Sequence, residues 1–205
     1  MMKSTVQLYR TPFSPAYWRQ SSKSMGDLRM LVFAALMIAM ARALSMLPSI
    51  PVGHTKITFG FLARALCALV CGPITALAYG FAEDILGFIL KPTGDFFFGY
   101  TLSTMLGVMV YALFLYRSRV TVLRLVAANA VVNIGVNAAL GSLWTMMMRG
   151  GGYWGWFIGS LSKNLVTIIP KAVLLYLLFQ ALLPILQQMK LIPRQLNDKG
   201  RISWI

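Results

Sequence analysis

The chain has 205 residues, of which 58% are hydrophobic and only 12% are charged, and its formal net charge is +14. A soluble domain has about 45–50% apolar and about 25% charged residues, so this composition excludes an ordinary water-exposed surface. In a soluble protein the basic excess would indicate nucleic-acid binding, but in so apolar a chain it indicates cytoplasmic loops and tails of a membrane protein.

Apolar segments follow one another along most of the chain, separated by prolines, glycines and short polar runs. About 20 apolar residues cross a bilayer core as a helix, so each segment is predicted to be a transmembrane helix. The segments are Leu28–Leu47, Ile57–Val70, Ile74–Leu90, Phe96–Tyr116, Thr121–Met148 and Trp156–Leu186. The predicted fold is therefore all-α, an integral membrane six-helix bundle over residues 29–186, with basic tails at 1–28 and 187–205.

The distribution of basic residues predicts the orientation of this bundle. With both termini on the cytoplasmic side, the inner regions hold 12 of the 19 Lys and Arg residues, the outer loops hold 3, and 4 fall within helices. Cytoplasmic loops are enriched in Lys and Arg, so we expect both tails inside. Cys67 and Cys71, four residues apart in one helix, have the wrong spacing for a disulfide and are expected to be small buried residues.

Ionisable residues within the predicted helices are costly in a membrane and often mark function. At 1.5 Å per helical residue, one group of them falls in a common layer, about 8–11 Å below the outer surface. These residues are Arg42, Arg64, Asp84 with its neighbour Glu83, and Lys163. Such a layer fits a pocket that opens outward and takes a polar solute.

Internal neutralisation is the alternative interpretation of these charges. Arg64 could pair with Asp84 or Glu83 across the hairpin of the second and third helices and serve only structure. Two acids cannot neutralise Arg42, Arg64 and Lys163 together, however, so at least one cation is left to favour an anionic ligand. Lys171 lies deeper, and the sequence assigns it no role.

The outer ends of the helices carry side chains suited to a flat, anionic ligand. Aromatic rings stack on flat heterocycles, and Lys or Arg pairs with carboxylates. The candidates are Lys56, Phe59, Phe61, Phe97, Tyr100 and Trp144. An interfacial aromatic belt is the alternative for such rings.

The sequence offers little for catalysis. It has one His and five acidic residues, no G-x-x-x-x-G-K-[ST] phosphate loop and no cysteine or histidine cluster, so we expect no enzyme activity, no cofactor and no metal. In the first helix, Ala35, Ala39 and Ala43 form one stripe of small residues. Such stripes let helices approach closely in lipid, either within the bundle or against a partner protein.

Several stretches together resemble the substrate-binding S components of energy-coupling factor (ECF) vitamin transporters, and within them the folate-specific type. They are Lys56-Ile-Thr-Phe-Gly-Phe-Leu62, Gly72-Pro73, Gly80-Phe-Ala-Glu-Asp84-Ile-Leu-Gly87, Phe98-Gly-Tyr-Thr-Leu-Ser103, Leu143-Trp144, Lys163-Asn164 and Leu174-Leu-Tyr-Leu-Leu178. The alanine stripe also fits this family.

This resemblance implies a six-helix subunit of the bacterial cytoplasmic membrane that binds folate with high affinity. It implies docking of the alanine stripe on a transmembrane coupling subunit, with uptake driven by two cytoplasmic ATPases. Asp84 or Asn164 would contact the pterin edge, the aromatic candidates would stack on the ring, and Arg42, Lys56, Arg64 or Lys163 would hold the anionic end. Another flat vitamin or precursor as ligand, or a membrane scaffold without a ligand, are the alternatives.

Overall fold

The computed structural model describes residues 14–52, 55–92, 94–193 and 202–204, and these residues form a helical bundle with one short β-hairpin. Five helical stretches are long and apolar enough to cross a membrane: α2 (Leu28–Met46), α4 (Pro73–Leu90), α5 (Phe98–Leu115), the continuous run Val122–Arg149, and α8 (Tyr153–Gln188). The apolar helix α3 (Gly60–Cys71) is shorter. The protein is therefore a multi-pass membrane protein of the helical-bundle class.

Helix α3 starts three residues later than the sequence indicates, because Ile57, the first residue of the predicted helix, is the last residue of a strand. Strands β1 (Ile50–Val52) and β2 (Thr55–Ile57) pair antiparallel, with Ile50 opposite Ile57. Twelve residues give α3 a length of about 18 Å, too short for a bilayer core. Nine of its twelve residues are buried, so α3 is an internal helix surrounded by protein.

Small side chains make this central position of α3 possible. Ala63, Ala65 and Ala68 are fully buried, and Cys67 and Cys71 are buried free thiols, as the sequence predicts. The chain then turns at Gly72, whose positive φ of 83° suits glycine, and α4 begins at once with Pro73.

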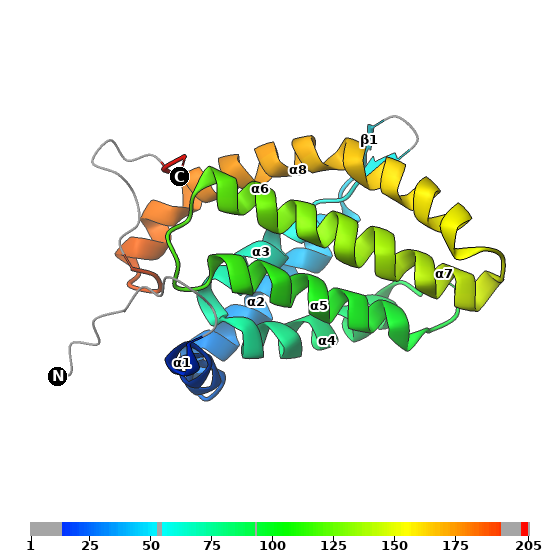
Figure 1. Ribbon diagram of the computed structural model, residues 1–205. Helices are drawn as coiled ribbons and strands as arrows, with labels where there is room; N and C mark the ends of the chain where they lie inside the picture. The colour runs from blue at the N-terminus through cyan, green and yellow to red at the C-terminus, as the bar shows by residue number, and fades with distance from the viewer. Residues whose placement is uncertain (1–13, 53–54, 93, 194–201, 205) are drawn as a thin grey trace.

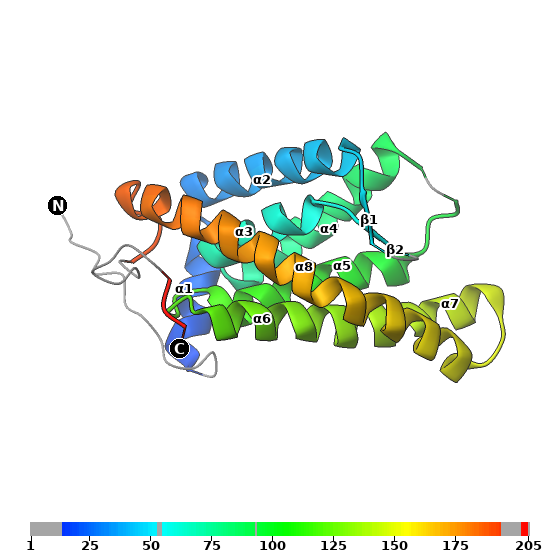
Figure 2. The ribbon, with the colours of Figure 1, turned by 90° about the horizontal axis from the view of Figure 1, so that it is seen from above.

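The predicted fifth helix is continuous but irregular. It consists of α6 (Val122–Val131), the π-helix η1 (Val132–Leu140) and α7 (Gly141–Arg149). Helix α8 follows after a glycine turn and runs obliquely across the other helices (Figure 2). Its 36 residues correspond to about 54 Å, which exceeds a bilayer core of about 30 Å.

The N-terminal segment contains a helix that the apolar pattern does not reveal. Helix α1 (Pro15–Met25) begins at a Ser14 cap and a proline, and its buried residues Tyr17 and Ser21 face the bundle. The Tyr17 hydroxyl donates to the Ala112 carbonyl at 3.1 Å, and the Ser21 hydroxyl accepts from the backbone of α4 at 3.0 Å. Burial raises the pKa of Tyr17, so this phenol stays protonated and keeps its donor.

The two described ends of the chain lie at the same end of the bundle, while α7 lies at the other (Figure 1). An isolated bridge between Thr121 and Ser203 holds the C-terminal residues beside the start of α6. Ala35, Ala39 and Ala43 are all exposed on α2, whereas Ala34 and Ala41 are buried. The stripe therefore faces away from the described bundle, and packing within it does not account for the stripe.

Candidate ligand-binding site

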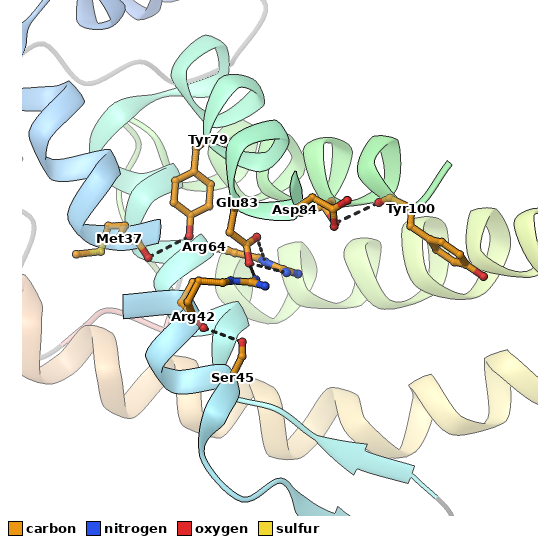
Figure 3. A network of polar contacts seen from close by, with 10 residues as sticks. Met37, Arg42, Ser45, Arg64, Tyr79, Glu83, Asp84 and Tyr100 are labelled. Atoms are coloured by element: carbon orange, nitrogen blue, oxygen red, sulfur yellow. Dashed lines mark hydrogen bonds and ion pairs between the residues drawn. The ribbon is translucent and has the colours of Figure 1, made fainter. Parts of the chain in front are cut away.

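One buried carboxylate holds two arginines where α2, α3 and α4 meet. Glu83, with no exposed side-chain surface, accepts from Arg64 Nε at 2.7 Å and Nη2 at 3.1 Å, and it also forms an ion pair with Arg42. Figure 3 shows both guanidinium groups converging on it. The partner of Arg64 across the hairpin is therefore Glu83, and this group of three carries a net charge of +1.

Asp84, the next residue, points to a different neighbour. Its two carboxylate oxygens accept from the hydroxyls of Thr101 at 2.7 Å and Thr104 at 3.1 Å, both on α5. Consecutive helical residues point about 100° apart, so Glu83 bonds to a side chain of α3 and Asp84 bonds to side chains of α5. No ion pair of Asp84 occurs within the described residues.

A cavity of about 320 Å³ lies among α3, α5, η1 and α8. Its volume is in the range of small-molecule sites. Fourteen residues line it: Ser45, Thr58, Gly60, Phe61, Arg64, Tyr100, Ser103, Thr104, Gly107, Tyr111, Val132, Asn133, Asn137 and Lys171. Three of the residues selected from the sequence are among them, namely Phe61, Arg64 and Tyr100.

Lys171 is a lining residue to which the sequence assigned no role. Its Nζ donates to Asn133 Oδ1 at 2.7 Å and lies 5.9 Å from the centre of the Phe61 ring. Asn133 in turn donates to the Asn129 side chain at 2.8 Å, and Asn129 donates to the Ile168 carbonyl at 2.9 Å. This polar chain orients the ammonium group and leaves it two further donors for the cavity.

The charges of the cavity are one-sided. Arg64 and Lys171 line it, and no acidic side chain does so among the residues that the structure describes. Two carboxylates contact lining residues from outside the cavity: Glu83 is shared by two arginines, and Asp84 accepts from Thr104. A cavity with such lining favours a ligand with anionic or acceptor groups.

Three of the aromatic candidates, Phe97, Tyr100 and Trp144, form a series of ring contacts beside this cavity. The Phe97 ring packs edge-on against Tyr100 and against Trp144, at 5.8 Å in each case. The Trp144 indole donates to Ser103 Oγ, a lining atom, at 2.8 Å. Phe59 is half-buried immediately before α3.

The remaining candidates lie elsewhere. Arg42 pairs with Glu83 beside Arg64 and is not a lining residue of the cavity. Lys163 is exposed and lines a second, neighbouring hollow. Asn164 donates to the Ser160 carbonyl of its own helix at 2.9 Å. The side chain of Lys56 lies outside the part of the chain that the structure describes.

The sequence did not select eleven of the lining residues, of which four lie on α5, three on η1 and one on α8. Asn133 and Asn137 lie in a π-helix, whose altered periodicity changes which side chains share a face. The signal that was available is compositional, because Asn129, Asn133 and Asn137 recur every four residues within an apolar helix. No cluster of three or more His, Cys, Asp or Glu residues that could hold a metal occurs in the described ranges.

The bundle and its internal polar cavity define a class of multi-pass membrane protein with room for a small polar solute between its helices. No family model matches the chain. A folate transporter FolT from Clostridium novyi is 28% identical over 152 residues, which cover 74% of this chain and 88% of the relative. A FolT from Leuconostoc mesenteroides is 27% identical over 123 residues, or 60% of this chain and 66% of the relative.

A solved structure agrees with these relatives. The crystal structure of FolT bound with folic acid aligns with a TM-score of 0.64 at 25% identity, covering 74% of this chain and 91% of that one. The resemblance to folate-specific S components that the sequence motifs indicate is therefore confirmed, and the chain is FolT-like in sequence and fold.

Proposed function

We propose that this chain is the membrane-embedded, high-affinity folate-binding subunit of an ATP-driven ECF-type uptake transporter in a bacterial cytoplasmic membrane. The observation that carries the proposal is the internal cavity, in which Arg64 and Lys171 face an unfilled space without a lining acid. The likeness to proteins named as folate transporters indicates folate as the ligand. Folate combines a flat heterocycle with carboxylates. The heterocycle matches the aromatic rings at the cavity, and the carboxylates match its surplus cations.

Each part of the ligand has candidate contacts in this proposal. Phe61 and Tyr100 line the cavity and would stack on the flat ring. Asp84 acts on the ring edge through Thr104, whose hydroxyl it accepts from at 3.1 Å. Arg64 and Lys163 would hold acceptor and anionic groups, because charge-assisted hydrogen bonds are the strong ones.

The six-span topology with both termini in the cytoplasm is part of the proposal. The 12-to-3 bias of basic residues supports it, as does the common end at which the described termini lie. The cavity then lies toward the external side, because α7 and the β-hairpin occupy the end opposite the termini (Figure 1).

Coupling to ATP hydrolysis requires partners, namely a transmembrane coupling subunit and two cytoplasmic ATPases. The exposed stripe Ala35, Ala39 and Ala43 offers a flat surface for close helix approach in lipid. Ala35→Trp or Ala39→Trp should abolish uptake and leave folate binding intact. Loss of binding in both variants would instead assign the stripe to the bundle itself.

The first experiment identifies the ligand of purified protein in detergent. Mass spectrometry of material released on denaturation should find folate, and added folate should quench tryptophan fluorescence saturably. Because Trp144 donates to a lining residue, Trp144→Phe should remove most of the quench. Trp204→Phe is the matched control, since this tryptophan is 79% exposed near the C-terminus. No bound or binding folate in well-folded protein would refute the proposed ligand.

Two substitutions test the cationic contacts. Arg64→Ala and Lys163→Ala should each weaken folate binding, with Lys163 the cleaner test because its side chain is exposed and forms no described ion pair. Folding is checked by the elution profile and thermal unfolding. Unchanged folate affinity in both variants would refute the proposed cationic contacts to the ligand.

A further inference from the structure

A further cavity lies at the opposite end of the bundle from the proposed folate site and is not part of that site. It has a volume of about 180 Å³. The last turn of α3 and the first turn of α2 line it, whereas the first turn of α3 lines the folate cavity. In the proposed topology it lies at the cytoplasmic surface of the membrane, and we call it the inner cavity.

The lining of the inner cavity is divided between polar and apolar elements. Helix α1, the turn after it and the turn between α5 and α6 contribute Gln20, Lys23, Ser24, Asp27 and Arg117. Helices α2 and α3 and the segment after α8 contribute Met30, Leu69, Val70, Leu191, Ile192 and Pro193. A small soluble anion would use only the polar part, whereas a phospholipid has a head group for one part and acyl chains for the other.

The cations of the inner cavity have capacity for a ligand. Neither Lys23 Nζ nor the Nη atoms of Arg117 form a hydrogen bond or an ion pair within the described residues. Asp27, an acid in the same lining, accepts from the Arg29 backbone at 3.0 Å and thereby caps α2. Lys23, Arg117 and Asp27 together carry a charge of +1, so a phosphodiester would meet two cations, and Asp27 can accept from a hydroxyl of the head group.

The turn between α5 and α6 holds Arg117 in place. Its φ is 49°, a left-handed conformation that is usual for glycine and uncommon for a residue with a Cβ. Its Nε donates to the hydroxyl of the buried Tyr116 at 3.1 Å, and its guanidinium lies 5.5 Å from the centre of that ring. The turn thus keeps a cation where the backbone suits glycine, and unusual backbone conformations of this kind cluster at ligand sites.

Helix α1 has the position and the surface of a helix that lies in the membrane interface. Figure 2 shows it running crosswise to α2 at the end of the bundle, so in a membrane-spanning bundle it lies along the membrane surface. Arg19 and Lys23 are exposed on it, as are Trp18 at 36% and Met25 at 44%. Basic residues beside exposed Trp and Met are typical of helices that lie among lipid head groups.

We propose that the inner cavity binds an anionic glycerophospholipid of the cytoplasmic leaflet, with its phosphate on Lys23 and Arg117 and the start of an acyl chain against the apolar lining. Bound lipid then joins α1 to the turn between α5 and α6 and stabilises this end of the bundle. The inference uses the topology of the proposed function and does not depend on its ligand.

The test measures lipid binding by the purified full chain in detergent. Phosphatidylglycerol should raise the unfolding temperature saturably, and phosphatidylcholine with the same acyl chains should not. The double variant Lys23→Gln with Arg117→Gln should bind phosphatidylglycerol at least about tenfold more weakly, because two charge-assisted contacts are lost. Arg19→Gln with Arg119→Gln is the control of equal charge and should stay within about twofold, since both arginines are exposed and neither lines the cavity.

Native mass spectrometry of the wild type gives a second measurement that needs no variant, and it should show one retained phosphatidylglycerol per chain. Equal binding of the two lipids, equal weakening by the two double variants, or equal stabilisation by glycerol 3-phosphate would overturn the lipid site. Folate affinity should match the wild type in both double variants, because the folate cavity lies at the other end of α3. Lipid binding as expected in wild-type protein that binds no folate would refute the proposed ligand and support the lipid site.

Discussion

Replacement of Glu83 by Gln tests whether the charged layer of the bundle is structural. The substitution keeps the shape of the side chain and removes its charge, so Arg42 and Arg64 lose the carboxylate that they share. The Gln oxygen can still accept from one guanidinium, but the amide NH2 only donates, and the side chain cannot neutralise two guanidinium groups. The two like charges then face each other at close range across a side chain with no exposed surface.

The magnitude follows from burial. Removing one partner of a buried ion pair costs about 3–5 kcal/mol. The side chains of Arg42 and Arg64 are 21% and 32% exposed, so water solvates them in part and the low end of that range applies. We expect a loss of about 3 kcal/mol, or about 6–12 °C in unfolding temperature for a chain of this size.

The assay is thermal unfolding of ligand-free protein in one detergent, because a bound ligand would add its own stabilisation. Asp95→Asn is the control, since Asp95 is an exposed acid in a loop and should change the unfolding temperature by less than about 1 °C. The double variant Arg42→Gln with Glu83→Gln should recover part of the loss, because one of the two unpaired cations is gone. An unfolding temperature of Glu83→Gln within about 2 °C of the wild type would refute the reasoning.

Three further predictions concern the cavity, the helix packing and α1. Lys171→Met should weaken folate binding at least about tenfold in a fluorescence titration, whereas Lys190→Met, at an exposed position just after α8, should not change it. Gly80→Ala should lower the unfolding temperature, since the new Cβ would lie 2.7 Å from the α5 backbone, and Gly135→Ala, with no atom within 4 Å, should not. Tyr17→Ala should release α1 and accelerate tryptic cleavage there, because this 1% exposed ring anchors the helix. Cleavage at the wild-type rate would show that α1 is held by other contacts.

The apolar pattern predicted the long helices well because lipid imposes a length and a composition on them. The bounds of α2 and α4 lie within a residue of those expected, and those of α5 lie within two. The pattern failed where protein replaces lipid as the surroundings. Ile57, predicted to begin a helix, pairs with another strand, and the mostly polar helix α1 is held by Tyr17 and Ser21.

The motifs predicted the kind of site better than its members. They indicated cations and rings at the outer half of the bundle, and Phe61, Arg64 and Tyr100 do line one cavity. They assigned no role to Lys171 or Asn133, because those side chains meet only where η1 packs against α8. An inter-helix contact of this kind leaves no local trace in the sequence.

The sequence alone thus determined that the protein lies in lipid, that it is helical and that it resembles folate-specific S components. Composition, segment length and local motifs are properties of the chain read in order. The tertiary structure decided which charges neutralise one another. It assigned both arginines to Glu83 and two threonines to Asp84, although the acids are adjacent in sequence. It also placed Arg149 and Lys163 beside a second hollow with no ion pair to either from the described residues, because pairing depends on which helices touch.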